Sequence, residues 1–156
     1  NTQLFWLVKH LSEFELNDCL EKKLIKKSIK SKAKALNDLK HADFFLEEAN
    51  DLVDLNKKEM AILALYNAAF HAARAILFND GFKERSHYCL EKYLEEKYEK
   101  TGKLEAEDIN LFDLLRGLRH EIQYGFGKIK IEENPEHLYN RTQKFIEKTK
   151  TIIGTK

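Results

Sequence analysis

The stretch from Lys57 to Asn79 limits what this chain can fold into more than any other part of it. Its apolar residues are so dense that almost no polar face remains: Ile62, Leu63, Leu65, Tyr66, Ala68, Ala69, Phe70, Ala72, Ala73, Ile76 and Leu77. A helix that is apolar nearly all round is buried at the centre of a protein. The stretch therefore predicts a central helix enclosed by others, and Gly81 just beyond it predicts a glycine cap at its C-terminal end.

Four further segments have the spacing of helices with one apolar side. They cover about Ser31–Leu55, Ser86–Lys100, Glu105–Tyr124 and Asn134–Ile153. One proline and six glycines are too few for the many turns of a β-sandwich. We therefore predict an all-α protein, an antiparallel four-helix up-and-down bundle with a short extra helix and an N-terminal helical extension.

The length of 156 residues supports one domain with its own hydrophobic core. We expect residues 1–30 to form an N-terminal extension packed on the bundle, and residues 31–156 to form the helical domain. Eight lysines lie between Lys22 and Lys40 against one acid, Asp38. Such a run is usually a solvated face or a linker, and contact with nucleic acid is the alternative.

Composition excludes several classes of protein. A net charge of +1 gives no overall field that steers the protein toward nucleic acid, so any basic surface must be local. Cys19 and Cys89 are too few for a disulfide framework, and we expect two small buried hydrophobes in a reducing cytosol. No stretch reaches the roughly 18 apolar residues of a membrane span. The first ten residues are too short and too early charged for a signal peptide, so we expect a cytoplasmic protein without membrane contact.

A narrow polar stripe interrupts the central helix. Asn67, His71 and Arg74 are spaced four and three apart, so they lie within about 60° of each other around the helix. A buried helix rarely carries three polar residues without partners. One explanation is a hydrogen-bond network between helices or a subunit interface; the other is that the stripe lines a binding site.

The helix at Glu105–Tyr124 separates an apolar from a polar face. Five polar side chains share an arc of roughly 140°: Arg116, Arg119, His120, Gln123 and Tyr124. Two guanidiniums, an imidazole and a phenol suit an anion or a phosphate, and His120 can exchange protons near neutral pH. An exposed face with nothing bound is the alternative. The chain has no phosphate-binding glycine loop, dinucleotide fingerprint or metal-ligand spacing, so we predict no metal and no cofactor.

Three segments together resemble the HEPN superfamily, the higher-eukaryote and prokaryote nucleotide-binding domain. They are Tyr66–Leu77 (YNAAFHAARAIL), Ser86-His87 and Leu114–Gly125 (LLRGLRHEIQYG), and the likeness to small archaeal and bacterial members extends over about Ser31–Ile153. The resemblance implies an antiparallel four-helix core with a shorter fifth helix, which forms a homodimer through the motif-bearing helix. Many members of the superfamily are metal-independent ribonucleases and act as toxins beside a small nucleotidyltransferase partner, so the resemblance implies this activity and this partner as possibilities to test.

The catalytic motif of that superfamily is an arginine, then a polar residue, then a histidine four to six residues further on. Arg119 and His120 match the arginine and the polar residue, but Tyr124 stands where the nearest-spaced histidine would fall. The next histidine, His137, lies beyond the helix. A tyrosine with an ordinary pKa near 10 is a poor general base at pH 7. A subgroup of the superfamily is similar, with an arginine followed five residues later by Tyr-Gly. The resemblance therefore implies the fold more strongly than it implies cleavage.

Three functions remain open. The first is a dimeric HEPN protein with a degenerate nuclease motif, part of a toxin–antitoxin-like module, that binds RNA or nucleotide phosphate through the residues of the two polar stripes: Arg116, Arg119, His120, Gln123, Tyr124, Asn67, His71 and Arg74. The second is an active endoribonuclease that uses Arg119 and His120, with Tyr124, at the position of the motif histidine, as a further candidate catalytic residue. The third is a non-catalytic module whose motif face, Tyr124 included, is buried against a partner.

Overall fold

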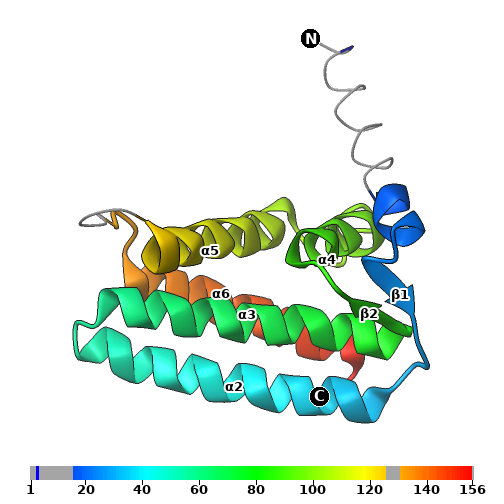
Figure 1. Ribbon diagram of the computed structural model, residues 1–156. Helices are drawn as coiled ribbons and strands as arrows, with labels where there is room; N and C mark the ends of the chain where they lie inside the picture. Colours follow the sequence, from blue (N-terminus) through cyan, green and yellow to red (C-terminus); the bar gives the residue numbers. More distant parts are fainter. Residues whose placement is uncertain (1–2, 4–15, 126–130, 156) are drawn as a thin grey trace.

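The computed structural model describes residue 3, residues 16–125 and residues 131–155. Its elements are β1 (Ile25–Lys27), α2 (Lys32–Asp54), α3 (Lys58–Asp80), β2 (Phe82–Glu84), α4 (His87–Leu94), a π-helical segment η1 (Glu95–Glu99), α5 (Ala106–Tyr124) and α6 (Pro135–Ile153). The long helix α3 packs against α2, α5 and α6 (Figure 1). The predicted all-α class is confirmed, and each long helix falls within a few residues of its expected bounds.

Local chemistry explains where these helices begin and end. The hydroxyl of Ser31 accepts a hydrogen bond from the Lys34 N–H (3.1 Å) and begins α2. Gly81 closes α3 in the left-handed conformation (φ 88°), and a side chain there would also meet the Ser28 carbonyl oxygen at 3.0 Å. Asn134 caps α6, and Pro135 is its first residue, where a missing N–H costs nothing.

The core centres on α3, as the sequence predicts. All alanines of α3 are buried, and so are three alanines spaced seven apart on α2, at 35, 42 and 49. Small side chains on both helices let α2 and α3 approach closely along their length. By length and composition α3 could cross a membrane, but 72% of its most apolar window is buried inside the structure, as in the core helix of a bundle.

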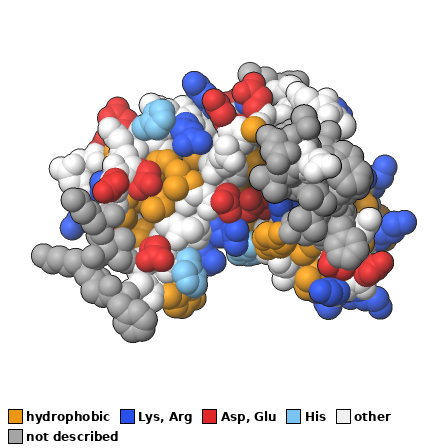
Figure 2. Space-filling view, turned by 90° about the horizontal axis from the view of Figure 1, so that it is seen from above, with side chains coloured by type: hydrophobic (Ala, Val, Ile, Leu, Met, Phe, Trp, Pro, Cys, Tyr) orange, Lys and Arg blue, Asp and Glu red, His pale blue; other side chains and the backbone are white. Residues whose placement is uncertain are grey.

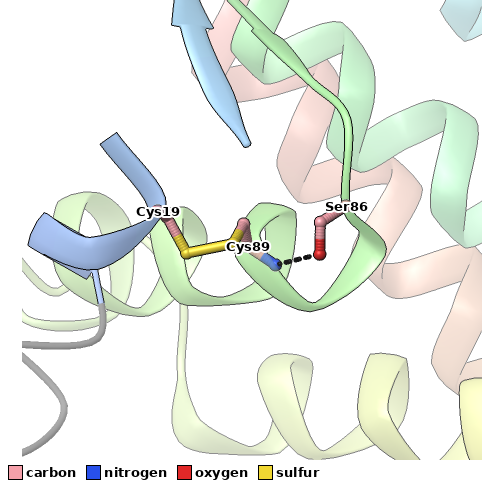
Figure 3. The surroundings of a disulfide bond; sticks show 3 residues. All are labelled: Cys19, Ser86 and Cys89. Atoms are coloured by element: carbon pink, nitrogen blue, oxygen red, sulfur yellow. Dashed lines mark hydrogen bonds between the residues drawn. A yellow bond between two sulfur atoms is a disulfide. The ribbon is translucent and has the colours of Figure 1, made fainter. Parts of the chain in front are cut away.

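A two-stranded ribbon and a disulfide depart from the sequence predictions. β1 pairs antiparallel with β2, with Lys26 opposite Lys83. Cys19, in a helical turn at residues 16–21, forms a disulfide with Cys89 of α4, with their Cα atoms 5.8 Å apart (Figure 3). The prediction of two separate buried thiols is therefore wrong, and the inference of a reducing compartment no longer follows from the cysteines.

Residues 16–30 contact the rest of the chain through this ribbon and this disulfide. Leu16, Cys19 and Ile25 are buried in the main core cluster. The remainder of the expected N-terminal extension, apart from Gln3, lies outside the described residues.

Candidate functional site

Three side chains from three helices meet where α3, α4 and α5 converge. Tyr66 of α3 is buried, and its hydroxyl forms a hydrogen bond with Nδ1 of His87, the first residue of α4. The Arg119 guanidinium of α5 lies over the Tyr66 ring, 4.7 Å from its centre. Ser86 caps α4 by accepting from the Cys89 N–H (3.3 Å), which fixes where His87 stands at the start of the helix (Figure 3).

Electrostatics keep both partners of the Tyr66–His87 hydrogen bond neutral. Burial raises the pKa of Tyr66, so it remains a neutral phenol. Burial first, and then the nearby charges of Arg119, Arg116 and Arg74, lower the pKa of His87, so its imidazole is neutral near pH 7. A neutral phenol O–H can donate to Nδ1 of His87, and in that arrangement the proton of the neutral ring is on Nε2. His87 Nε2 is then a hydrogen-bond donor.

Arg119 carries a charge that the described part of the chain does not neutralise. Its side chain is half-buried, its Nε is buried without a hydrogen-bond partner, and no carboxylate among the described residues forms an ion pair with it. Stacking on a tyrosine ring holds a guanidinium in place and leaves its N–H edge able to bind an anion. Phe70, whose ring centre is 4.4 Å from that of His87, lies beside them and adds apolar surface.

Arg116 differs from Arg119 because it has acidic neighbours. Arg116 donates a hydrogen bond to Asp113 (2.8 Å). Its Nε is 3.5 Å from Glu91 Oε2, and both Nε and Oε2 are buried without a hydrogen bond. Burial, reinforced by the charge of Asp113, raises the pKa of Glu91 to about 7, and Arg116 opposes the rise. The sequence predicts Arg116 and Arg119 as parts of one anion-binding surface, but in the structure only Arg119 keeps a charge that no carboxylate of the described chain neutralises.

The other predicted residues of α5 point to solvent. His120, Gln123 and Tyr124 are exposed, and the rings of His120 and Tyr124 are 5.2 Å apart. Figure 2 looks down on the side of the molecule that carries α4 and α5, and it shows hydrophobic side chains exposed among basic, acidic and histidine side chains. The structure therefore places the two arginines against α3 and α4, and the other three on the open side of α5.

The polar stripe of α3 faces other partners. Asn67 donates to the Leu63 carbonyl oxygen (2.9 Å) within its own helix. His71 Nδ1 is 3.1 Å from Asp38 Oδ1 on α2, and Arg74 Nε is 3.8 Å from Asp38 Oδ2 and 3.5 Å from Glu84 Oε1 on β2. These contacts form the network between elements that was one of the two explanations of the stripe.

Sequence reasoning did not assign a role to several members of the α3–α4–α5 cluster. His87 entered only as part of the resemblance, and Tyr66 was assigned to the core, where it does lie. Glu91 carried no sequence signal, because only the packing of α4 on α5 brings it to Arg116. Among residues 16–125 and 131–155, together with residue 3, no cluster of three or more metal-ligating side chains occurs.

A family model for the HEPN domain matches residues 33–152 of the chain. The chain belongs to the HEPN family. The matched region runs from the start of α2 almost to the end of α6, so it contains the whole α3–α4–α5 cluster. A search among curated proteins found no match. HEPN membership indicates, in general terms, a function related to nucleotides or RNA.

Proposed function

We propose that this HEPN domain binds the phosphate of RNA or of a nucleotide at the α3–α4–α5 cluster, with Arg119 as the principal contact. The observation that carries the proposal is the Arg119 guanidinium, stacked 4.7 Å from the Tyr66 ring centre and without a carboxylate partner in the described chain. Charge-assisted hydrogen bonds from a guanidinium to phosphate oxygens are among the strongest in proteins. A fixed, unneutralised arginine is therefore suited to this ligand.

His87 and Arg116 support the same ligand in different ways. The neutral imidazole of His87 offers an Nε2–H to a second phosphate oxygen without requiring a proton from solution. When Glu91 is protonated, it no longer neutralises the charge of Arg116, and that charge becomes available to the phosphate. The Glu91 pKa of about 7 places this change near neutral pH. RNA affinity should therefore increase as the pH falls from 8 to 6.

The hydrogen bond with Tyr66 favours binding over cleavage by His87. With Tyr66 as the donor to Nδ1 and a proton on Nε2, the His87 ring has no free nitrogen that could act as a general base. His120 remains the candidate base for a ribonuclease, and it is exposed on α5 beside Tyr124.

The exposed side of α5 suits contact with another chain. Tyr124 has 64% of its surface exposed, and it stands next to His120. We extend the proposal to a homodimer formed through α5, with a small nucleotidyltransferase as the further partner. Sedimentation of the wild type and of Tyr124→Asp tests the homodimer: a dimer that the substitution converts to a monomer supports it, and a wild-type monomer contradicts it.

Fluorescence anisotropy with a short labelled single-stranded RNA tests the binding site. Arg119→Ala should weaken RNA binding about tenfold or more, which corresponds to about 1.4 kcal/mol. Arg141→Ala removes the same charge from a half-buried position on α6, outside the cluster, and it should change the affinity about twofold at most. Equal losses in the two variants would show that only net charge matters, and would contradict the assignment of Arg119.

Incubation of metal-free protein with total RNA separates the three functions. The proposal predicts binding without cleavage. Cleavage to 2′,3′-cyclic phosphate ends that both Arg119→Ala and His120→Ala abolish would establish a ribonuclease instead. Absence of both cleavage and binding would favour a module that acts only through a protein partner.

A further inference from the structure

A pocket of about 580 Å³ lies where α2, α3 and β2 meet. None of its lining residues belongs to α4 or α5, so it is separate from the cluster around Arg119. Its volume falls in the range of small-molecule sites. The charges, the aromatic ring and the buried acid that line it together indicate what it would hold.

Positive charge is concentrated at this pocket. Lys34 of α2, Arg74 of α3 and Lys83 of β2 line it, whereas Asp38 is the one carboxylate among its described lining residues. Neither lysine forms an ion pair within the described chain. Lys83 also stands directly opposite Lys26 in the β1–β2 ladder, a pairing of like charges that disfavours the ribbon. An anion in the pocket would relieve this repulsion.

Two of these cations share one aromatic ring. The Lys34 ammonium lies 5.6 Å and the Arg74 guanidinium 5.0 Å from the centre of the Phe78 ring, which is itself buried. The ring holds both side chains at the pocket by cation–π attraction. Because Arg74 already pairs with Asp38 and Glu84, the charge that remains for an anion is that of Lys34 and of Lys83 on β2.

The acid in the pocket has an unused acceptor. Asp38 is 5% exposed, and its Oδ1 pairs with His71 Nδ1 at 3.1 Å. Its Oδ2 is buried without a hydrogen bond, and Arg74 Nε, 3.8 Å away, also lacks one. A buried carboxylate oxygen without a donor is costly, so a ligand hydroxyl or amine that reaches it would be favoured.

We propose that this pocket binds a phosphate ester that also carries a hydroxyl or amine group, as the ribose phosphate of a nucleotide does. Lys34 and Lys83 hold the phosphate, and Asp38 Oδ2 accepts a hydrogen bond from the hydroxyl or amine. The ligand is either a free mononucleotide or one nucleotide of an RNA strand. The site does not depend on Arg119, and it gives part of the lysine-rich run between Lys22 and Lys40 a function.

Isothermal titration calorimetry with adenosine 5′-monophosphate, and anisotropy with a short single-stranded RNA, test this pocket. The pocket variant is Lys34→Ala with Lys83→Ala. Its matched control is Lys27→Ala with Lys40→Ala, which changes the net charge equally. Both lysines are exposed; Lys40 lies on α2, and Lys27 lies on β1, the strand that pairs with β2. We expect the pocket variant to lose at least about tenfold in affinity for the nucleotide, and the control to change less than about twofold. Thermal melting verifies that both variants fold.

The outcomes distinguish the two ligand sources and separate this site from the first one. Loss of nucleotide binding in the pocket variant, with retention in Arg119→Ala, supports a free nucleotide. No nucleotide binding, but weaker RNA binding in the pocket variant than in its control, supports an RNA strand. Equal affinities of the pocket variant and its control for both probes would overturn the proposal, and so would a wild type that binds neither. Retained nucleotide binding in the pocket variant, with loss in Arg119→Ala, would assign all phosphate binding to the first site.

Asp38→Asn tests the contact with the unused acceptor. The substitution makes the pocket more positive, so it should raise the affinity for sulfate, which has no hydrogen-bond donor. It should lower the affinity for adenosine 5′-monophosphate relative to sulfate about fivefold or more. An unchanged ratio of the two affinities would contradict the role of Asp38.

Discussion

The two sides of α3 carry similar residue types in opposite arrangements. Toward α2, a buried carboxylate, Asp38, stands at the centre, and His71 and Arg74 surround it. Toward α4 and α5, a guanidinium, Arg119, stands at the centre, and its close neighbours are neutral: a phenol and an imidazole. The carboxylates beside Arg74 make it a tie between elements, whereas Arg119 has no carboxylate partner in the described chain and keeps its charge available. The comparison predicts that the network around Asp38 contributes more to stability than Arg119 does.

The two sides are also fixed by different means. α4 is joined to residues 16–21 by the disulfide between Cys19 and Cys89, whereas α2 is held by close packing and by the network around Asp38. Changes to each of these attachments should therefore affect one side more than the other.

Loss of the disulfide should have the largest effect. Replacing both Cys19 and Cys89 by serine removes a link between residues 70 positions apart, which for a loop of that length is worth about 4 kcal/mol. Denaturant unfolding measures the loss, and the variant should be insensitive to reductant. Amide hydrogen exchange should accelerate in α4 and not in α2. Equal acceleration in both helices would contradict the separation of the two sides.

Asp38→Ala should follow, with a loss of about 3 kcal/mol in the free energy of unfolding. Removal of a carboxylate from a buried polar network is strongly destabilising, and here it leaves His71 Nδ1 without its partner and Arg74 with Glu84 alone. Asp43→Ala is the control on the same helix, since its pair with Lys150 is half-exposed and surface pairs contribute under about 1 kcal/mol. Similar losses of stability in the two variants would show that the buried network around Asp38 stabilises the fold no more than a surface ion pair does.

Glu91 of α4 should make the free energy of unfolding depend on pH. Its folded-state pKa of about 7 lies above the ordinary value of 4.5, so the folded protein binds the proton more tightly than the unfolded chain does. The resulting stabilisation is complete below pH 4.5, and it is lost as the pH rises toward 7 and beyond. Glu91→Gln should remove this part of the dependence, on the order of 2 kcal/mol. Denaturant titrations at several pH values measure it, and parallel curves for wild type and variant would contradict the assignment.

Arg119→Ala should have the smallest effect on stability. The guanidinium gains only its contact with the Tyr66 ring, worth about 0.5–1 kcal/mol. Thermal and denaturant unfolding test this value. A loss as large as that of Asp38→Ala would make Arg119 a structural residue and remove the distinction between the two sides.

The sequence predicted much of the fold because its signals are local. Apolar spacing, the helix starts near Ser31 and Asn134 and the Gly81 cap are each contained within one helix, and the structure confirms them. The ribbon escaped prediction because two strands of three residues have no detectable period, and their pairing is non-local. The disulfide escaped for a similar reason, since spacing in sequence does not show that Cys19 and Cys89 are close.

The candidate site was predicted only in part. Helical periodicity placed Arg116 and Arg119 on one face with His120, but it could not show which of them would meet another helix. Arg116 is paired because Glu91 of α4 lies beside it, and Arg119 stacks on Tyr66 of α3 without a carboxylate partner in the described chain. Such partners are set by packing between elements, and for this reason the sequence could not distinguish the two sides of α3.

The most direct test of the central claim is an NMR titration of the arginine Nε–H signals with a short single-stranded RNA. Because Arg119 Nε is buried and lacks a hydrogen-bond partner, binding of a phosphate should shift the Arg119 signal strongly and slow its exchange with water. The Arg141 signal on α6 should remain in place. RNA binding that shifts other arginine signals and leaves Arg119 unchanged would contradict the account.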